Sequence, residues 1–69
     1  MKMTEERLNG EIVKIALDGR LDIEGTQQVE QAFAYSTTTR AGRFAVDLSS
    51  VTFLASIGIR MLLTAARAL

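Results

Sequence analysis

One stretch of this sequence, Phe44–Leu69, constrains the fold more than any other because its apolar spacing changes abruptly at Ser56. Before that change, Phe44–Leu48 is nearly continuous in apolar residues, which predicts a strand covered on both faces. After Ser56, apolar residues recur at helical spacing and predict a helix with an apolar face. The members of that face are Ile59, Leu62, Leu63, Ala66 and Leu69. The stretch therefore predicts a buried strand, a turn and a helix, with Ser56 at the junction.

Upstream of this stretch, the sequence predicts a β-hairpin. Met1–Leu8 shows a weak strand pattern, and Glu11–Leu17 shows a stronger one that is rich in aliphatic and β-branched residues. Asn9-Gly10 lies between them and suits a two-residue turn, because both residues tolerate a positive φ. Residues 18–22, DGRLD, are expected to end the second strand as a turn.

A helix is predicted to begin at about Glu24, where apolar residues start to recur at helical spacing. Its buried stripe is expected to comprise Val29, Ala32, Phe33 and Ser36. Three side chains compete for the role of cap at its start, since Asp22, Glu24 and Thr26 can each accept hydrogen bonds from first-turn N–H groups. Three threonines of low helix propensity at positions 37–39, followed by Gly42, mark the end of the helix.

These elements combine into an α/β fold in the order β-β-α-β-α, with a βαβ unit at its centre. Ser49-Ser50 is expected to interrupt the last strand, after which Val51, Phe53 and Leu54 return the chain to the core. A sheet of about three strands with two helices leaves an open edge or an uncovered face, and the last helix has no C-terminal cap. We therefore expect a single domain over residues 1–69 that is incomplete, or that forms a homo-oligomer through its uncovered sheet edge or last helix.

Composition argues against several classes of function. Eight basic residues balance eight acidic ones, so nothing in the charge points to a nucleic acid. Cysteine and histidine are absent, which removes disulfides, thiol nucleophiles and most zinc sites, so we expect no cofactor, no metal and no enzymatic activity. No window approaches the ~20 apolar residues of a membrane span, and the N-terminus lacks the apolar core of a signal peptide. We expect a cytoplasmic protein with no membrane partner.

Ser56 has two competing interpretations. As a structural residue, its hydroxyl would cap the N–H groups of Gly58 or Ile59, and this interpretation is the stronger one for a serine considered alone. As a functional residue, it occupies a helix start, where free N–H groups and the helix dipole favour negative charge. A phosphate adding a charge of about −1.5 to −2 would be tolerated there. Gly58 fits equally well with close approach of a partner's backbone or with simple packing.

A nucleophilic role for Ser56 has little support. The run Leu54–Gly58 carries the second glycine of the G-x-S-x-G elbow but has Leu54 where the first should be. The chain has no histidine to act as a base, and Lys14 lies within a predicted strand, where nothing suggests a substitute base. An enzymatic function is therefore not expected.

Two motifs carry a resemblance to a known family. The run Asp47–Ile59, DLSSVTFLASIGI, resembles the signature of STAS domains, the family of anti-sigma factor antagonists and of sulfate-transporter cytoplasmic domains. The run Ile15–Asp22, IALDGRLD, is similar to the family's strand ending in G-x-L-D. Both motifs occur in the family's order and at its separation, so the resemblance extends over most of the chain. Ala55 stands where the family usually has aspartate, and Ile57 where it has serine or threonine.

The resemblance implies a mixed β-sheet flanked by helices, with the two motifs close together at one end. It also implies a protein-binding switch that regulates sigma factor activity. In the antagonist branch, the unphosphorylated protein binds an anti-sigma factor that is also a serine kinase, and phosphorylation by that kinase breaks the complex. Ser56 matches the phosphoacceptor serine. The predicted partner-binding residues around it are Asp22, Ala55, Ile57, Gly58 and Arg60.

A second hypothesis belongs to a different class of function. The chain could be a constitutive STAS interaction or assembly module with no phospho-switch, in which Ser56 is merely a helix cap. The two hypotheses differ in whether a negative charge at Ser56 changes partner binding.

Overall fold

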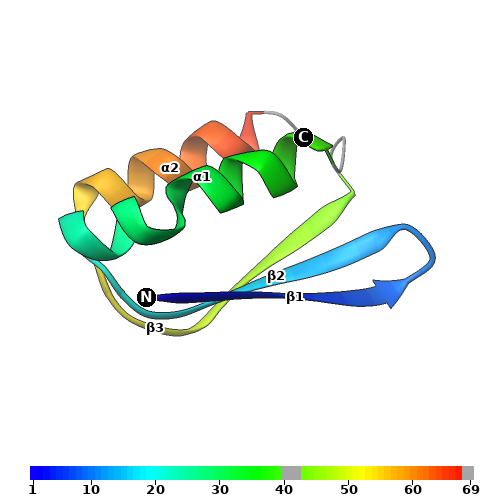
Figure 1. Ribbon diagram of the computed structural model, residues 1–69, viewed down its shortest axis with the longest axis horizontal. Helices are drawn as coiled ribbons and strands as arrows, with labels where there is room; N and C mark the ends of the chain where they lie inside the picture. The colour runs from blue at the N-terminus through cyan, green and yellow to red at the C-terminus, as the bar shows by residue number, and fades with distance from the viewer. Residues whose placement is uncertain (40–42, 68–69) are drawn as a thin grey trace.

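Five elements follow one another in the predicted order β-β-α-β-α in a computed structural model, which describes residues 1–39 and 43–67 (Figure 1). The elements are β1 (Lys2–Asn9), β2 (Ile12–Leu21), α1 (Ile23–Thr39), β3 (Phe44–Leu54) and α2 (Ser56–Ala66). The predicted α/β class and element order are therefore confirmed.

The three strands form one mixed sheet in the order β1-β2-β3. β1 pairs with β2 in antiparallel orientation, and β2 pairs with β3 in parallel orientation. Helix α1 makes the crossover between the two parallel strands, as the predicted βαβ unit requires. Both helices lie side by side over the same face of the sheet (Figure 1). The opposite face and both edges of this three-stranded sheet have no covering element among the described residues, which confirms the expected open edge and uncovered face.

The core lies between the helices and the inner face of β2. Val13, Ile15 and Leu17 alternate along β2 and are buried, as a strand with one covered face requires. Phe33 of α1 is 1% exposed and packs in the same cluster. Burial of a side chain of this size stabilises the fold by about 1.5–3 kcal/mol.

A row of charged side chains crosses the outer face of the sheet. Lys14 of β2 lies between two acidic side chains, with its Nζ 3.2 Å from a carboxylate oxygen of Glu6 on β1 and 3.9 Å from one of Asp47 on β3. These three residues form a charged row across all three strands.

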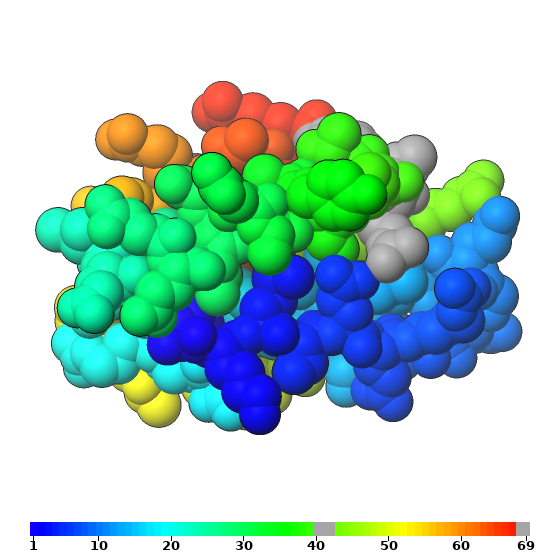
Figure 2. All heavy atoms as spheres, in the orientation of Figure 1, coloured from blue at the N-terminus to red at the C-terminus, as the bar shows by residue number. Residues whose placement is uncertain are grey.

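The hairpin between β1 and β2 differs by one residue from the predicted turn. Asn9 pairs with Ile12, so the two connecting residues are Gly10 and Glu11, whereas the sequence predicted Asn9-Gly10. Gly10 supplies the positive φ, at 58°. A bulge between Arg7 and Asn9 accounts for the shift. The hairpin end of the sheet projects beyond the helices (Figure 2).

The prediction that residues 18–22 form a turn is wrong, because β2 continues to Leu21. Gly19 adopts a φ of 119°, and the register with β3 shifts on both sides of it. A glycine with a positive φ suits both a β-bulge and a turn, so the local sequence does not distinguish these two structures. Leu21 is fully buried and anchors the end of β2 in the core.

Strand β3 is also longer and more exposed than predicted. It runs without a break through Ser49-Ser50, which the sequence predicted as an interruption, because bulges absorb the extra residues. The backbone N–H of Ser49 donates to the Oδ1 atom of Asp47 at 2.9 Å. The prediction that both faces are covered is wrong, since β3 lies at the sheet edge and none of its residues is buried. Phe53 and Leu54 are 43% and 41% exposed, and Val51 packs against the core.

The helix faces were predicted partly correctly. In α1, Val29, Phe33 and Ser36 are buried as expected, but Ala32 is exposed. Thr39 ends the helix as predicted, and Gly42 lies outside the described residues. In α2 the buried positions are Gly58 and Ala65. The predicted apolar residues of α2 lie partly or largely on the surface: Leu62 is half-buried, Ile59, Leu63 and Ala66 are exposed, and Leu69 lies outside the described residues.

Gly25 allows α1 to begin directly against the end of β2, which gives a first testable prediction. A Cβ atom at this position would overlap the carbonyl oxygen of Arg20. We expect Gly25→Ala to lower the free energy of unfolding by about 3 kcal/mol, although helix propensity alone would raise it by about 1 kcal/mol. Urea denaturation measures the difference. Ala32→Gly, at an exposed position of the same helix, is the control and should lower the free energy of unfolding by about 1 kcal/mol. A Gly25→Ala variant at least as stable as the wild type would contradict the prediction.

Candidate functional site

The candidate site lies where the two parallel strands end and both helices begin. Leu21, the last residue of β2, is the register partner of Leu54, the last residue of β3. The backbone N–H of Ala55 donates to the carbonyl oxygen of Leu21 at 3.0 Å. This hydrogen bond brings the two sequence motifs together at one end of the sheet. Ligand sites of open α/β sheets commonly form at the carboxyl ends of parallel strands.

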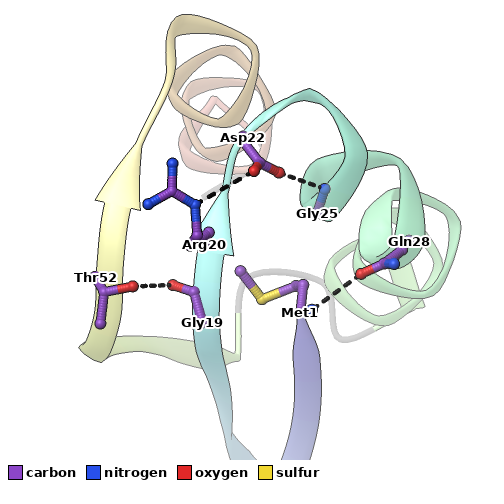
Figure 3. A network of polar contacts seen from close by, with 7 residues as sticks. All are labelled: Met1, Gly19, Arg20, Asp22, Gly25, Gln28 and Thr52. Carbon is purple, nitrogen blue, oxygen red and sulfur yellow. Dashed lines mark hydrogen bonds and ion pairs between the residues drawn. The ribbon is translucent and has the colours of Figure 1, made fainter.

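Asp22 caps the first turn of α1. Its Oδ1 atom accepts a hydrogen bond of 2.7 Å from the backbone N–H of Gly25 (Figure 3). This hydrogen bond is the main reason why the pKa of the Asp22 carboxyl is below its ordinary value. Of the three capping candidates, the structure therefore selects Asp22, which acts here as a fixed negative charge.

Arg20 belongs to the site although the sequence did not single it out. Its Nε atom lies 3.4 Å from the Oδ2 atom of Asp22 (Figure 3), and its guanidinium lies 4.4 Å from the centre of the Phe53 ring. The hydroxyl of Thr52 donates to the carbonyl oxygen of Gly19 and joins β3 to β2 beside it. The sequence contained one indication of this contact. Arg20 lies two residues before Asp22, and residues two apart in a strand lie on the same face.

The prediction that Ser56 caps α2 is wrong. The cap residue is Ala55, with φ −86° and ψ 166°, and no side chain caps this helix start. The carbonyl oxygen of Ala55 accepts the N–H of Ile59 at 3.1 Å. Ser56 is the first helical residue and is exposed, and its hydroxyl makes no hydrogen bond to any residue that the structure describes. The fold therefore makes no use of the Ser56 hydroxyl.

Gly58 is the most deeply placed of the predicted partner-binding residues. It is buried, and a Cβ atom there would lie 3.0 Å from both the Cβ atom and the carbonyl oxygen of Leu21. The same Cβ would lie 3.3 Å from a methyl group of Leu54. Gly58 thus lets α2 approach the ends of both parallel strands, and packing accounts for it without a partner.

Ile57 and Arg60 face a groove between the two helices. The groove has a volume of about 430 Å³, and six of the residues that line it are Glu30, Phe33 and Ala34 of α1 with Ile57, Arg60 and Met61 of α2. Its apolar floor is flanked by an acidic side chain on one helix and a basic side chain on the other. Asp22, Ala55 and Ser56 thus lie at the strand ends, Ile57 and Arg60 line the adjoining groove, and Gly58 lies beneath them.

Residues 1–39 and 43–67, which the structure describes, offer neither a cluster of metal ligands nor a helix suited to a membrane. Those residues contain no group of three or more acidic, cysteine or histidine side chains placed to bind a metal ion. Neither helix, over its described length, is long and apolar enough to cross a membrane.

Comparison with protein families gave one match. Residues 4–69 match the family model described as Mlab, STAS domain. Comparison with curated protein sequences gave no match.

Comparison with solved structures gave two similar chains. One is the anti-sigma factor antagonist SpoIIAA in its unphosphorylated form, and the other is the Bacillus cell fate determinant SpoIIAA in the phosphorylated form. Each superposes with a TM-score of 0.68 at 21% sequence identity, over 97% of this chain. The match spans 62% of the first chain and 61% of the second. At this identity the comparison shows a shared fold.

The Asp22 cap gives a prediction about stability in acid. Because the folded chain lowers the pKa of this carboxyl, its stabilising effect is present above the ordinary value of 3.8 and is lost as the pH falls through the lower folded pKa. Asp22→Asn keeps an acceptor oxygen but cannot titrate. We therefore expect the wild type to have a higher free energy of unfolding than Asp22→Asn at neutral pH. This difference should disappear in acid, where the Asp22 carboxyl is protonated.

Urea denaturation of both proteins, from neutral pH to below pH 3.8, measures this gap. Asp22→Ala is the control, because it removes the acceptor itself and should remain less stable than Asp22→Asn at every pH. If the difference in free energy of unfolding between wild type and Asp22→Asn does not change with pH, the charge of the Asp22 carboxylate does not contribute to stability.

Proposed function

The chain belongs to the STAS domain family, and from this membership we propose that it is a phosphorylation-controlled protein-binding switch of the anti-sigma factor antagonist type. In this proposal the unphosphorylated protein binds an anti-sigma factor that is also a serine kinase, and the sigma factor is released. The kinase phosphorylates Ser56, and the complex dissociates. The protein would act in the cytoplasm and would need no catalytic activity of its own.

The exposed Ser56 hydroxyl is the observation that carries this proposal. It lies at the start of α2, where no side chain caps the helix. A kinase needs access to a hydroxyl that the fold does not engage, and Ser56 satisfies this requirement. The next hydroxyl residue on each side of Ser56 along the chain, Thr52 and Thr64, donates to a backbone carbonyl oxygen.

The helix start also makes a phosphate on Ser56 compatible with the fold. The first N–H groups of α2 have no side-chain acceptor, and the helix dipole favours negative charge at this end. Phosphorylation would therefore change the surface of the protein without unfolding it.

The surroundings of Ser56 supply a reason for the complex to dissociate. Ala55 and Ile57 flank it with half-buried apolar side chains, and Asp22 adds a carboxylate at the same end of the sheet. A partner that packs against the apolar side chains would have to remove water from a phosphate carrying a charge of about −1.5 to −2, which is costly without compensating positive charge.

The similarity in fold adds support of a general kind. SpoIIAA, which shares this fold, is described as an anti-sigma factor antagonist and has been solved with and without phosphate. The family membership and this similarity in fold support a protein as the class of binding partner to test first.

The test uses the purified chain, an anti-sigma factor kinase and ATP. Intact-mass measurement and fragmentation should find one phosphate, located on Ser56, and none on Ser56→Ala. We expect Ser56→Ala to bind the kinase like the unphosphorylated wild type, and Ser56→Asp to bind about tenfold more weakly or worse, because a carboxylate is then desolvated at the interface. Isothermal titration calorimetry measures both affinities.

Thr4→Asp is the matched control, since Thr4 is an exposed hydroxyl residue on β1, at the other edge of the sheet. It should leave the affinity unchanged. An unmodified Ser56 in a protein that still forms the complex would overturn the switch, and equal binding by Ser56→Asp and the wild type would favour the constitutive interaction module instead.

A further inference from the structure

Arg60 is a positive side chain that lies beside Ser56 on α2. It follows Ser56 by four residues, and both side chains are exposed. Residues four apart on a helix are neighbours, with Cβ atoms about 5–6 Å apart. Arg60 forms no ion pair with any residue that the structure describes. Its guanidinium is therefore available to a negative group on Ser56.

The order of the two residues along the helix favours such a pair. Side chains of an α-helix lean toward its N-terminus, so the Arg60 side chain leans toward the turn that carries Ser56. An acidic group stabilises a helix more when it lies four residues before a basic one than when it lies four residues after it. A phosphate on Ser56 would be an acidic group in the favourable position.

The two helices of this chain also differ in the charge at their starts. The Asp22 carboxylate caps α1, and Glu24 adds a second negative charge in its first turn. The first turn of α2 contains no acidic residue, and no side chain caps it. Unmodified α2 therefore offers Arg60 no negative partner on its own first turn.

We propose that a phosphate on Ser56 forms an ion pair with the Arg60 guanidinium, and that phosphorylation thereby stabilises α2 and neutralises Arg60. The inference rests on the phosphorylation of Ser56 proposed above and identifies the residue that responds to it. The phosphoryl group comes from ATP and replaces the proton of the Ser56 hydroxyl. The contact with Arg60 is a charge-assisted hydrogen bond, in which guanidinium N–H groups donate to phosphate oxygens.

This pair leaves the modified surface negative. Arg60 contributes one positive charge, whereas the phosphate contributes about −1.5 to −2. The remaining negative charge still has to be desolvated by a partner that packs against the apolar side chains around Ser56, and this is costly. The pair is therefore compatible with dissociation of the complex.

Arg60 also connects Ser56 with the groove between the two helices. Among the described residues that line the groove, Arg60 is the only basic one and Glu30 is the only acidic one. When the phosphate neutralises Arg60, the charge of this lining changes from balanced to negative. Phosphorylation would thus change the groove as well as the strand ends.

The test measures the second pKa of the phosphate, ordinarily about 6, by phosphorus NMR on a chain made with phosphoserine at position 56. Arg60 favours the dianion, so we expect Arg60→Gln to raise this pKa by about 0.2–0.4 of a pH unit, the shift that corresponds to an ordinary ion pair four residues apart. Asp22 and Glu30, the carboxylates of the neighbouring elements, act on both proteins alike, so the comparison isolates Arg60.

Arg67→Gln is the matched control. Arg67 is also exposed, but it lies about 16 Å further along the helix axis than Ser56, beyond the screening length of about 8–10 Å. This variant should leave the phosphate pKa unchanged. Arg60→Lys keeps the positive charge and should keep the pKa low. Circular dichroism verifies that each variant is folded.

Urea denaturation gives a second measure of the same pair. The phosphate should raise the equilibrium constant for folding, and Arg60→Gln should reduce this increase about twofold. The unmodified forms of both proteins complete a double-mutant cycle, which separates the pair from any other effect of the substitution.

Two results would refute the ion pair. One is an equal phosphate pKa in the wild type and Arg60→Gln, and the other is a shift in Arg67→Gln as large as that in Arg60→Gln. Neither result depends on a kinase, because the phosphate is introduced when the chain is made. If the Arg60-dependent shift is found and the kinase nevertheless leaves Ser56 unmodified, the ion pair stands and the proposed function fails.

Discussion

The parallel pairing of β2 with β3 is the interaction on which the rest of the structure depends. It places Leu21 beside Leu54 and allows the hydrogen bond from the Ala55 N–H to the Leu21 carbonyl oxygen. Both helices must then begin at the same edge of the sheet and run back over the same face. The buried side chains of β2 are covered as a consequence, and the caps of the two helices become neighbours. The core and the candidate site thus follow from one pairing.

The sequence predicted elements well where a local pattern decides them. The aliphatic and β-branched residues of Glu11–Leu17 indicated a strand, and the spacing of Val29 and Phe33 indicated the inner side of α1. It failed where tertiary pairing decides, because residues 18–22 and Ser49-Ser50 contain turn-forming residues that the structure uses as bulges. A glycine such as Gly19 permits either conformation. Only the neighbouring strand selects between them.

The candidate site was predictable from its motifs but not in its detail. The two motifs indicated that Asp22 and Ser56 would lie at one end of the sheet, and the Leu21–Ala55 hydrogen bond accounts for this. Residue type suggested that Ser56 caps α2, yet the backbone of Ala55 takes that position without help from a side chain. Arg20 was missed because, although Asp22 lies only two residues away, its other contact is with Phe53, on a strand far away in the sequence. Local propensity contains no information of that kind.

Helix α2 presents different chemistry at its start and along its length. Periodicity predicted its apolar residues only in part, because Ile59 and Leu63 are exposed and α1 faces the side that carries Arg60 and Met61. Ser56 lies at the helix start, whereas Leu63 lies seven residues later, about 10 Å along the axis. Charges exposed to water are largely screened over about 8–10 Å at physiological salt. A phosphate on Ser56 would therefore act strongly on groups at the strand ends and weakly on Leu63 and Ala66. A phosphate there would accordingly alter the strand ends and the first turns of this eleven-residue helix, and leave the end of the helix little changed.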